Sequence, residues 1–437
     1  MEQRFLEGMS PGLVRVAQAA RRNPGRLLSL AHHLDVEALR RAFCRIRSNA
    51  AVGVDGVTKE AYGANLEENL QDLHNRLRTM RYRHQPILRV FIDKEGGRKR
   101  PIGISAIEDK IVQDSLRELL QAIYEQDFLP CSYGFRPGRS AHDALRSLDG
   151  AAHRGEARWV LEADIVSFFD RIDRKRSKEL LKLRCADKAL MRIIGKCLHV
   201  GVVEAGAMVT PETGTTQGST LSPLLANVYL HYVLDLWFEH EVKGRLKGKA
   251  TLIRYCDDFV IAFERRDEAE QVHEWLTSRF AEYGLELHAD KTRLVDFRRP
   301  PKTHRGGGPG TFDFLGFTVL WRRSAQGRGG WHMATQTRVS RLRKAKRAVH
   351  EWCRRHRHDS IREQHAALVR RIRGHFSYFG VRGNERRMYL LIRAVERSWY
   401  KWLNRRSQRS TMDWRRFKDL LKDFPLPVPR TMVSLWG

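Results

Sequence analysis

Residues 252–263 read LIRYCDDFVIAF, with apolar residues on both sides of two adjacent carboxylates, Asp257 and Asp258. This pattern predicts two strands joined by a tight turn, with the acids at its tip. Carboxylates between buried strands cost free energy unless another charge offsets them. Magnesium is held by one or two carboxylates together with substrate phosphates, so the pair predicts a metal site. A solvent-exposed turn that happens to contain two aspartates is the competing interpretation.

A third acid, Asp164, lies at the end of a short apolar strand predicted at 159–165, 93 residues before Asp257. One acid at a strand end and two at a hairpin tip suit a two-metal site for phosphoryl transfer, in which ions about 3.5–4 Å apart stabilise the attacking and leaving oxygens. The chain contains no G-x-x-x-x-G-K-[ST] phosphate loop, so a P-loop arrangement is excluded.

The composition favours a polyanionic partner. The chain has 437 residues, with 80 Lys and Arg against 51 Asp and Glu, a net charge of +29. Nucleic acid is the usual partner of such an excess. No apolar run approaches the roughly 18 residues of a membrane span, so we expect no membrane association. The six cysteines form no C-x-x-C pair, which favours neither zinc nor disulfides and indicates a reducing, cytoplasmic location.

The positive charge is concentrated at the end of the chain. From Arg338 onward there are 27 Lys and Arg against 8 Asp and Glu, and five of the ten tryptophans. Val339, Leu342, Ala345 and Val349 recur at helical spacing there. This region is predicted to be a basic helical unit.

The remaining pattern alternates helices with strand hairpins, which indicates the α+β class. We expect strands at 87–93, 312–321 and 331–335, and helices over much of 1–50 and at 66–80, 107–128, 222–241 and 267–284.

Ten motifs follow one another in the order found in one protein family. They are GVDGVT (53–58), RKRPIGISAIEDKIVQ (98–113), SYGFRPGRSAHDAL (132–145), EADIVSFFDRID (162–173), TTQGSTLSPLLANVYL (215–230), RYCDDFVI (254–261), GLELHADKT (284–292), FDFLGF (312–317), RIRGHFSYFGVRGN (371–384) and KWLNRRSQRSTMDWRRF (401–417). In these motifs the chain resembles bacterial group II intron reverse transcriptases/maturases, and the resemblance covers nearly its whole length.

The resemblance implies a right-hand polymerase, with antiparallel sheet in fingers and palm, a helical thumb and a basic maturase domain. The implied division is 1–160 for the N-terminal extension and fingers, 161–335 for the palm with interleaved fingers segments, 336–380 for the thumb and 381–437 for the maturase region. The implied function is RNA-directed DNA synthesis with assistance to splicing, and copying of the intron during retrohoming of the mobile element.

The resemblance also implies roles for individual residues. Asp164, Asp257 and Asp258, with the Ile165 carbonyl, would hold two Mg²⁺ ions, with Mn²⁺ as an alternative. The nucleotide site would include Lys99, Arg100, Phe169 and Gln217. Phe169 would exclude a ribose 2′-hydroxyl, and a guanidinium fork would suit phosphate. Which of Arg98, Lys99 and Arg100 reaches the triphosphate stays open. Primer or template contacts would include Lys291, Gly316 and Arg136, the last of which would alternatively link the fingers internally. RNA-binding candidates are Arg341, Lys344, Arg371, Arg373, Arg405 and Arg406.

The partners implied are group II intron RNA, a template–primer duplex, deoxynucleoside triphosphates and target DNA. Cys256, Thr216 and Ser219 depart from the family pattern, and the last two leave nucleotide preference open. Nothing resembling an HNH endonuclease follows residue 430, so we expect a protein that primes from an existing DNA 3′ end. A domesticated or defence-related enzyme and a splicing-only maturase are the alternatives.

Overall fold

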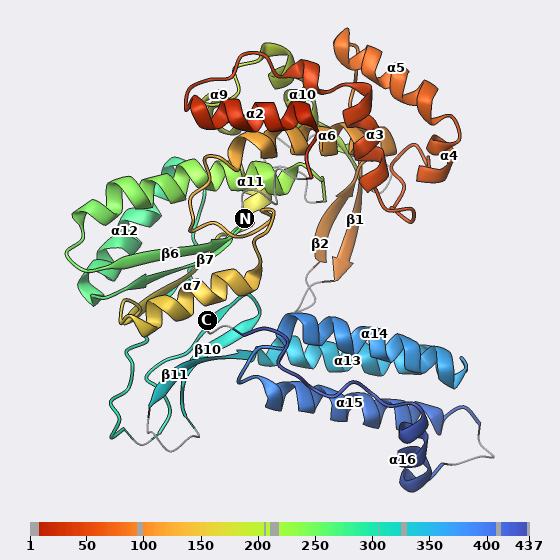
Figure 1. Ribbon diagram of the computed structural model, residues 1–437, viewed down its shortest axis with the longest axis vertical. Helices are drawn as coiled ribbons and strands as arrows, with labels where there is room; N and C mark the ends of the chain where they lie inside the picture. The colour runs from red at the N-terminus through yellow and green to blue at the C-terminus, as the bar shows by residue number, and fades with distance from the viewer. Residues whose placement is uncertain are drawn as a thin grey trace.

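The computed structural model describes residues 8–93, 99–204, 207–209, 218–304, 306–324, 330–407 and 412–434. These ranges combine helices with three small sheets, so the α+β class is confirmed. In Figure 1 the N-terminal helices lie at the top, a four-stranded sheet in the middle and the C-terminal helices at the bottom. Among the described helices, none combines the length and apolar character needed to cross a bilayer.

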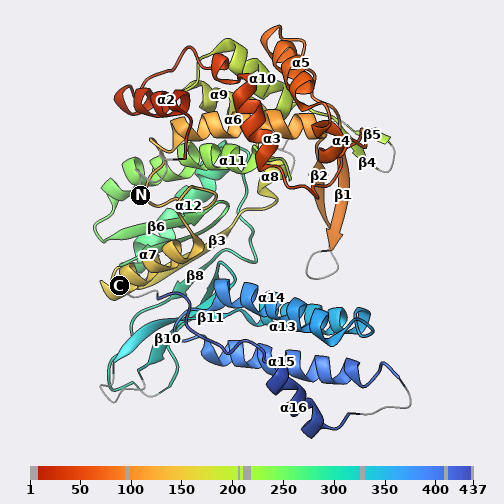
Figure 2. The same ribbon diagram turned by 45° about the vertical axis from the view of Figure 1, so that its right-hand side comes forward.

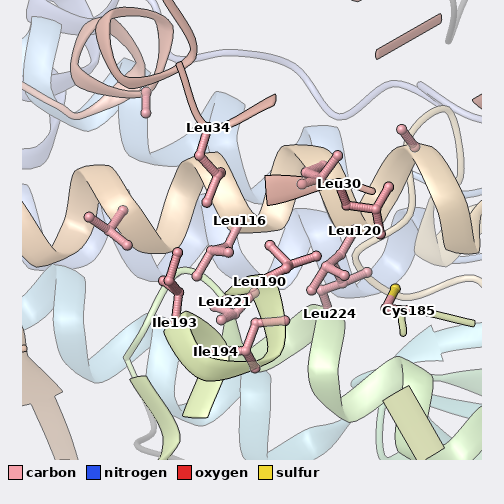
Figure 3. Packing of buried hydrophobic residues seen from close by; sticks show 14 of the residues in the cluster. Leu30, Leu34, Leu116, Leu120, Cys185, Leu190, Ile193, Ile194, Leu221 and Leu224 are labelled. Atoms are coloured by element: carbon pink, nitrogen blue, oxygen red, sulfur yellow. The ribbon is translucent and has the colours of Figure 1, made fainter. Parts of the chain in front are cut away.

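The N-terminal helices pack around one buried helix. They are α2 (Pro11–Arg22), α3 (Val36–Arg45), α4 (Lys59–Gly63), α5 (Leu66–Arg78), α6 (Ile107–Tyr124), α9 (Arg174–Lys182) and α10 (Lys188–Leu198). Figure 3 shows Leu116 and Leu120 of α6 close to Leu190 and Ile194 of α10. Because α6 is covered by helices from both earlier and later in the sequence, its apolar residues are not confined to one face.

A β-hairpin extends from these helices. It consists of β1 (Ile87–Asp93) and β2 (Lys99–Ile104), which pair antiparallel. The two short strands β4 (Val202–Glu204) and β5 (Ala207–Val209) complete this sheet, with β4 parallel to β1. The strand predicted at 87–93 is confirmed.

The central sheet has the strand order β6-β7-β3-β8, with every pair antiparallel. Its strands are β3 (Trp159–Asp164), β6 (Ala250–Tyr255), β7 (Asp258–Phe263) and β8 (Arg293–Asp296). The helices next to it are α7 (Ala141–His153), α8 (Phe168–Arg171), α11 (Ser222–Leu230) and α12 (Arg266–Glu282). Phe259 and Ile261 pack in the same core as α11 and α12, whereas Val260 and Ala262 pack with α7. Both faces are therefore covered, which explains the unbroken apolar run of β7.

The third sheet corrects one prediction. The strand expected at 312–321 is interrupted by a turn at Leu315 and Gly316, which separates β9 (Phe312–Phe314) from β10 (Phe317–Arg323). Both turn residues have positive φ, +52° and +79°, which suits a two-residue hairpin connection. The partner strand, β11 (Trp331–Thr337), pairs along all of β10.

The C-terminal helices share a single hydrophobic core. They are α13 (Val339–Arg355), α14 (Ile361–Phe379), α15 (Glu385–Leu403) and α16 (Trp414–Asp423), and Figure 2 shows the first three side by side. The expected thumb–maturase boundary at residue 380 falls inside this core. Leu342 and Val349 are buried as predicted, but Val339, at the first turn of α13, is exposed.

Candidate active site

The three acids meet at one end of the central sheet. Asp164 is the last residue of β3 and Asp258 the first of β7, and the two are direct partners in the antiparallel pairing. Such partners have Cα atoms about 4.5–5.5 Å apart. Asp257 precedes Asp258 in the two-residue connection from β6, which places all three at the same edge. Two strands far apart in sequence thus bring together the acids that the sequence predicted.

The connection that carries Asp257 has an unusual backbone. Cys256 has a φ of +59°, in the left-handed region that non-glycine residues rarely adopt. The Arg254 guanidinium donates a hydrogen bond of 3.0 Å from Nη1 to the Cys256 carbonyl oxygen and so holds the turn from behind. Gly134 lies close to the same turn, because a Cβ placed on it would be 2.5 Å from the Cys256 nitrogen.

Arg254 is fully buried and every arm of its guanidinium has a partner. Asp235 accepts bonds from Nε (2.7 Å) and Nη2 (2.5 Å). Asn227 Oδ1 accepts from Nη1 at 2.9 Å, and Ser132 Oγ accepts from Nη2 at 2.8 Å. This network joins α11 and the segment after α6 to the turn that carries Asp257. It was missed from the sequence, although a lone arginine inside an apolar strand is a signal of such a buried pair.

The environment of the acids disfavours their charged forms. Burial raises the pKa of Asp257, and the like charge of Asp164 adds to this, whereas Arg100 opposes it. Although Asp258 keeps contact with solvent, desolvation by the surrounding protein and the charges of Asp257 and Asp164 raise its pKa to about 7. A bound cation would offset this repulsion.

Two further segments reach the acids. The backbone of Leu315, in the β9–β10 turn, hydrogen-bonds the Asp258 carboxylate and opposes the rise in its pKa. This contact places the neighbouring Gly316 beside the site. The Lys291 ammonium forms an ion pair with the Asp164 carboxylate, and the His288 backbone N–H donates to the Asp164 carbonyl oxygen at 2.8 Å. Both segments were expected near the primer, and the structure places both next to Asp164 and Asp258.

Phe169 lies just beyond β3, in α8. Its ring is half-buried and meets the buried Phe168 ring edge-on, with centroids 5.4 Å apart. Ile165, which follows Asp164 in the chain, is buried. The chain turns into α8 at Ser167, whose φ is +45°, so Phe169 is held on a short, tightly turned segment.

The predicted phosphate-contacting cations lie on β2. Lys99 and Arg100 are exposed, and the charge of Arg100 acts on Asp257. Of these two, Arg100 is therefore the one for which the structure shows an influence on the acids. Arg98 and the nucleotide-pocket candidate Gln217, with Thr216, lie outside the described residues.

Arg136 has internal partners. Its buried guanidinium donates to Glu125 and to the carbonyl oxygens of Leu129 and Ser132, and it lies over the Phe128 ring. This geometry favours the internal-linkage alternative over a template contact.

The RNA-binding candidates divide into exposed side chains and one that bonds within the protein. Exposed residues are Arg341 and Lys344 on α13, Arg371 and Arg373 on α14, and Arg405 after α15. Arg406 instead donates to the carbonyl oxygens of Arg357 and Asp359, at the α13–α14 connection. Trp399 is fully buried and donates to Gln364 at 2.8 Å, so it belongs to the helical core.

The acid cluster fits an open metal site. In the described part of the chain, no three Asp, Glu, His or Cys side chains form a ready-made metal cage. Magnesium does not require one, since it keeps waters and takes substrate phosphates as ligands. Three hard oxygen donors at one sheet edge suit such a cation, and burial and nearby like charges raise the pKa of two of them, Asp257 and Asp258.

Comparison with known proteins identifies one matching family and several relatives. Residues 92–319 match the family described as "Reverse transcriptase (RNA-dependent DNA polymerase)". The chain is 31% identical over 307 residues to Protein YkfC of Escherichia coli K12, covering 63% of this chain and 77% of that protein. It is 37% identical over 344 residues to the group II intron-encoded protein LtrA of Lactococcus lactis, covering 65% of this chain and 55% of LtrA. A putative COX1/OXI3 intron 1 protein of Saccharomyces cerevisiae is 31% identical over 224 residues, 51% of this chain and 26% of that protein. The chain thus spans only about half of LtrA's length.

Proposed function

Because the chain belongs to the reverse transcriptase (RNA-dependent DNA polymerase) family, we propose that it extends a DNA primer along an RNA template by two-metal phosphoryl transfer. The observation that carries this proposal is the pairing of Asp164 with Asp258 across β3 and β7, with Asp257 in the adjoining turn. Three carboxylates at one sheet edge can hold cations against the reacting phosphate and oxygens.

The acids act as a preorganised set of ligands. Asp164, Asp257 and Asp258, with the Ile165 carbonyl, would hold two Mg²⁺ ions, with Mn²⁺ as the alternative. When bound, the metal would make the primer 3′-hydroxyl easier to deprotonate and would neutralise the departing pyrophosphate. The Arg254 network keeps Asp257 in place, so the ligands need no rearrangement at the moment of reaction.

Other residues bind and select the nucleotide. Arg100, whose charge reaches Asp257, would contact the triphosphate, together with Lys99. Phe169 would stand beside the sugar and exclude a 2′-hydroxyl, and Gln217 would line the same pocket. Lys291 and the turn at Gly316 would contact the primer strand next to the acids.

Two observations support an association with an intron RNA: the names of the relatives and the positive charge of the C-terminal helices. LtrA is a group II intron-encoded protein, and a yeast relative is named for a COX1/OXI3 intron. We propose that this chain binds a group II intron RNA through its basic C-terminal helices, assists its splicing and copies it into target DNA during retrohoming. Segments 1–160, 161–335, 336–380 and 381–437 would act as fingers, palm, thumb and maturase region.

Primer extension tests the polymerase assignment directly. Purified protein is given an RNA template, a DNA primer, deoxynucleoside triphosphates and Mg²⁺, and template-length DNA is expected. A protein that binds a group II intron transcript tightly and stimulates its splicing, yet extends no primer, would be a splicing-only maturase and would contradict the proposal. If the protein extends primers but binds intron and unrelated transcripts with equal affinity, the polymerase assignment stands and the proposed intron role is wrong.

A further inference from the structure

A pocket lined by basic side chains lies away from Asp164, Asp257 and Asp258. A pocket of about 480 Å³ opens where α9 and α10 meet the segment that leads into β1. In Figures 1 and 2, β1 runs from this helical layer toward the tip of its hairpin. Seven strand residues rise about 3.3 Å each, so roughly 20 Å separates the pocket from the tip, where Asp93 pairs with Lys99. The pocket is therefore distinct from the nucleotide-binding end of the hairpin.

One face of α10 forms one side of the pocket. Arg192, Lys196 and His199 recur at helical spacing and line it. The opposite face of the helix carries residues such as Leu190 and Ile194, which Figure 3 shows buried in the N-terminal core. Because that core fixes the helix, the positive face is held toward the pocket.

Lys178 and Arg83 add charge from two other elements. Lys178, on α9, places its Nζ 2.7 Å from His199 Nε2. Gly195 makes room for this lysine, since a Cβ there would be 3.2 Å from the Lys178 Nζ. Arg83 reaches the pocket from the segment before β1. Basic side chains thus converge from three parts of the chain.

The described residues that line the pocket include no Asp or Glu to balance this charge. The pKa of Lys196 is lowered by burial and then by Arg192 and Arg83, while that of Lys178 is lowered by burial and then by Lys182 and Arg174, which do not line the pocket. The Lys196 ammonium donates to the carbonyl oxygens of Met80 and Tyr82, which fixes its place beside Arg192 and Arg83. A bound anion would relieve the repulsion that remains among these cations.

We propose that this pocket binds phosphate groups of an RNA backbone, as an anchor separate from the polymerase site. Phosphate contacts need cations and no base-specific groups. The described lining residues include no Phe, Tyr or Trp, and of the two histidines there the His84 side chain is buried and His199 is engaged by Lys178. The lining therefore favours phosphate contacts over the stacking of a nucleotide base. The choice of RNA as the polyanion rests on the proposed function, whereas the existence of a phosphate site does not.

The test compares two double variants with equal loss of charge. Lys178→Ala/Arg192→Ala removes pocket cations, and Lys175→Ala/Lys188→Ala removes exposed lysines from the same two helices outside the pocket. Affinity for a group II intron transcript is measured across a salt series, beside primer extension on a short template–primer duplex. For the pocket variant we expect about a tenfold loss of affinity near 0.1 M salt and a salt slope shallower by about 1–2. Primer extension should not change.

Controls separate the outcomes. Lys178→Arg/Arg192→Lys keeps the charges and should keep wild-type affinity, and melting temperatures show whether each variant is folded. Equal weakening by the pocket and control pairs would overturn the proposal, because net charge alone would then explain binding. Inorganic phosphate forms the second arm: if it stabilises the wild type but not the pocket variant while RNA affinity is unchanged, the site serves free phosphate and the RNA assignment is wrong. If the wild-type protein is inactive in primer extension, the proposed polymerase function is wrong. The comparison of RNA affinities between the variants can still be interpreted in that case.

Discussion

Arg254 Nη1 donates a 3.0 Å hydrogen bond to the carbonyl oxygen of Cys256, from a guanidinium with no exposed surface. The same guanidinium donates two hydrogen bonds to the Asp235 carboxylate. A charge buried this deeply is tolerated because it is paired and fully hydrogen-bonded. The turn that carries Asp257 is therefore fixed from inside the protein, and we expect Arg254 to act as a positioning residue.

Arg254→Lys should slow DNA synthesis more than it weakens nucleotide binding. A lysine keeps the charge but cannot reach Asp235, Asn227, Ser132 and Cys256 together. A displacement of the acids by about 1 Å costs roughly 10- to 100-fold in rate. We expect kcat to fall by that factor with a smaller change in KM, measured on protein shown to be folded by its melting curve.

Arg293→Lys is the matched control, because Arg293 pairs with Glu162 on the same sheet but is half-exposed. Exposed pairs contribute about 0–1 kcal/mol, so this variant should keep near wild-type kcat. If the Arg254 variant lost activity only in proportion to its loss of folded protein, a positioning role would be ruled out.

Phe169→Ala should admit ribonucleotides. The ring lies five residues after Asp164 and is held edge-on against Phe168, so its removal opens space at the proposed sugar position. Incorporation rates of ribo- and deoxynucleotides are compared in the same extension assay. Unchanged sugar discrimination in an active variant would remove Phe169 from this role.

Asp109 should make stability depend on pH. Burial raises its pKa to about 7, although the Tyr82 hydroxyl and the Gln85 N–H both donate to it. Above about pH 4 the unfolded chain has released this proton while the folded protein still holds it. The free energy of unfolding therefore falls as pH rises from about 4 to 7, by up to about 4 kcal/mol for this group, and then levels off.

Asp109→Asn isolates that contribution, because an amide does not titrate. Urea unfolding of both proteins at pH 5 and pH 8 gives the comparison. The variant should lose less stability than the wild type between the two values. Equal losses would show that Asp109 is ionised in the folded protein.

Much of the polymerase centre could be predicted from the sequence. The apolar run around Asp257 and the strand before Asp164 have clear periodicity, and both strands are present with the acids at their ends. Local patterns are informative there because both faces of the sheet are buried. The turn at Leu315 was missed, since its positive φ is imposed by the pairing of β9 with β10 and by contact with Asp258.

Long-range partners could not be predicted. The bonds from Arg254 to Asp235 and Asn227 join segments whose closeness depends on the whole fold. The same limit applies to the cations, since sequence alone did not separate the internal Arg136 and Arg406 from the exposed Arg341. Charge at a position is visible in sequence, whereas the direction of a long side chain depends on its neighbours.

The most direct test of the polymerase centre is Asp257→Ala, assayed for primer extension and for RNA binding on the same preparation. Asp296→Ala is its control, because Asp296 lies on β8 at the opposite end of the sheet, beside Trp159. We expect Asp257→Ala to abolish DNA synthesis while RNA affinity stays within about tenfold, since distant sites act independently, and Asp296→Ala to remain active. DNA synthesis by Asp257→Ala, or an equal loss of synthesis and RNA binding, would contradict the assignment of these acids as the catalytic centre.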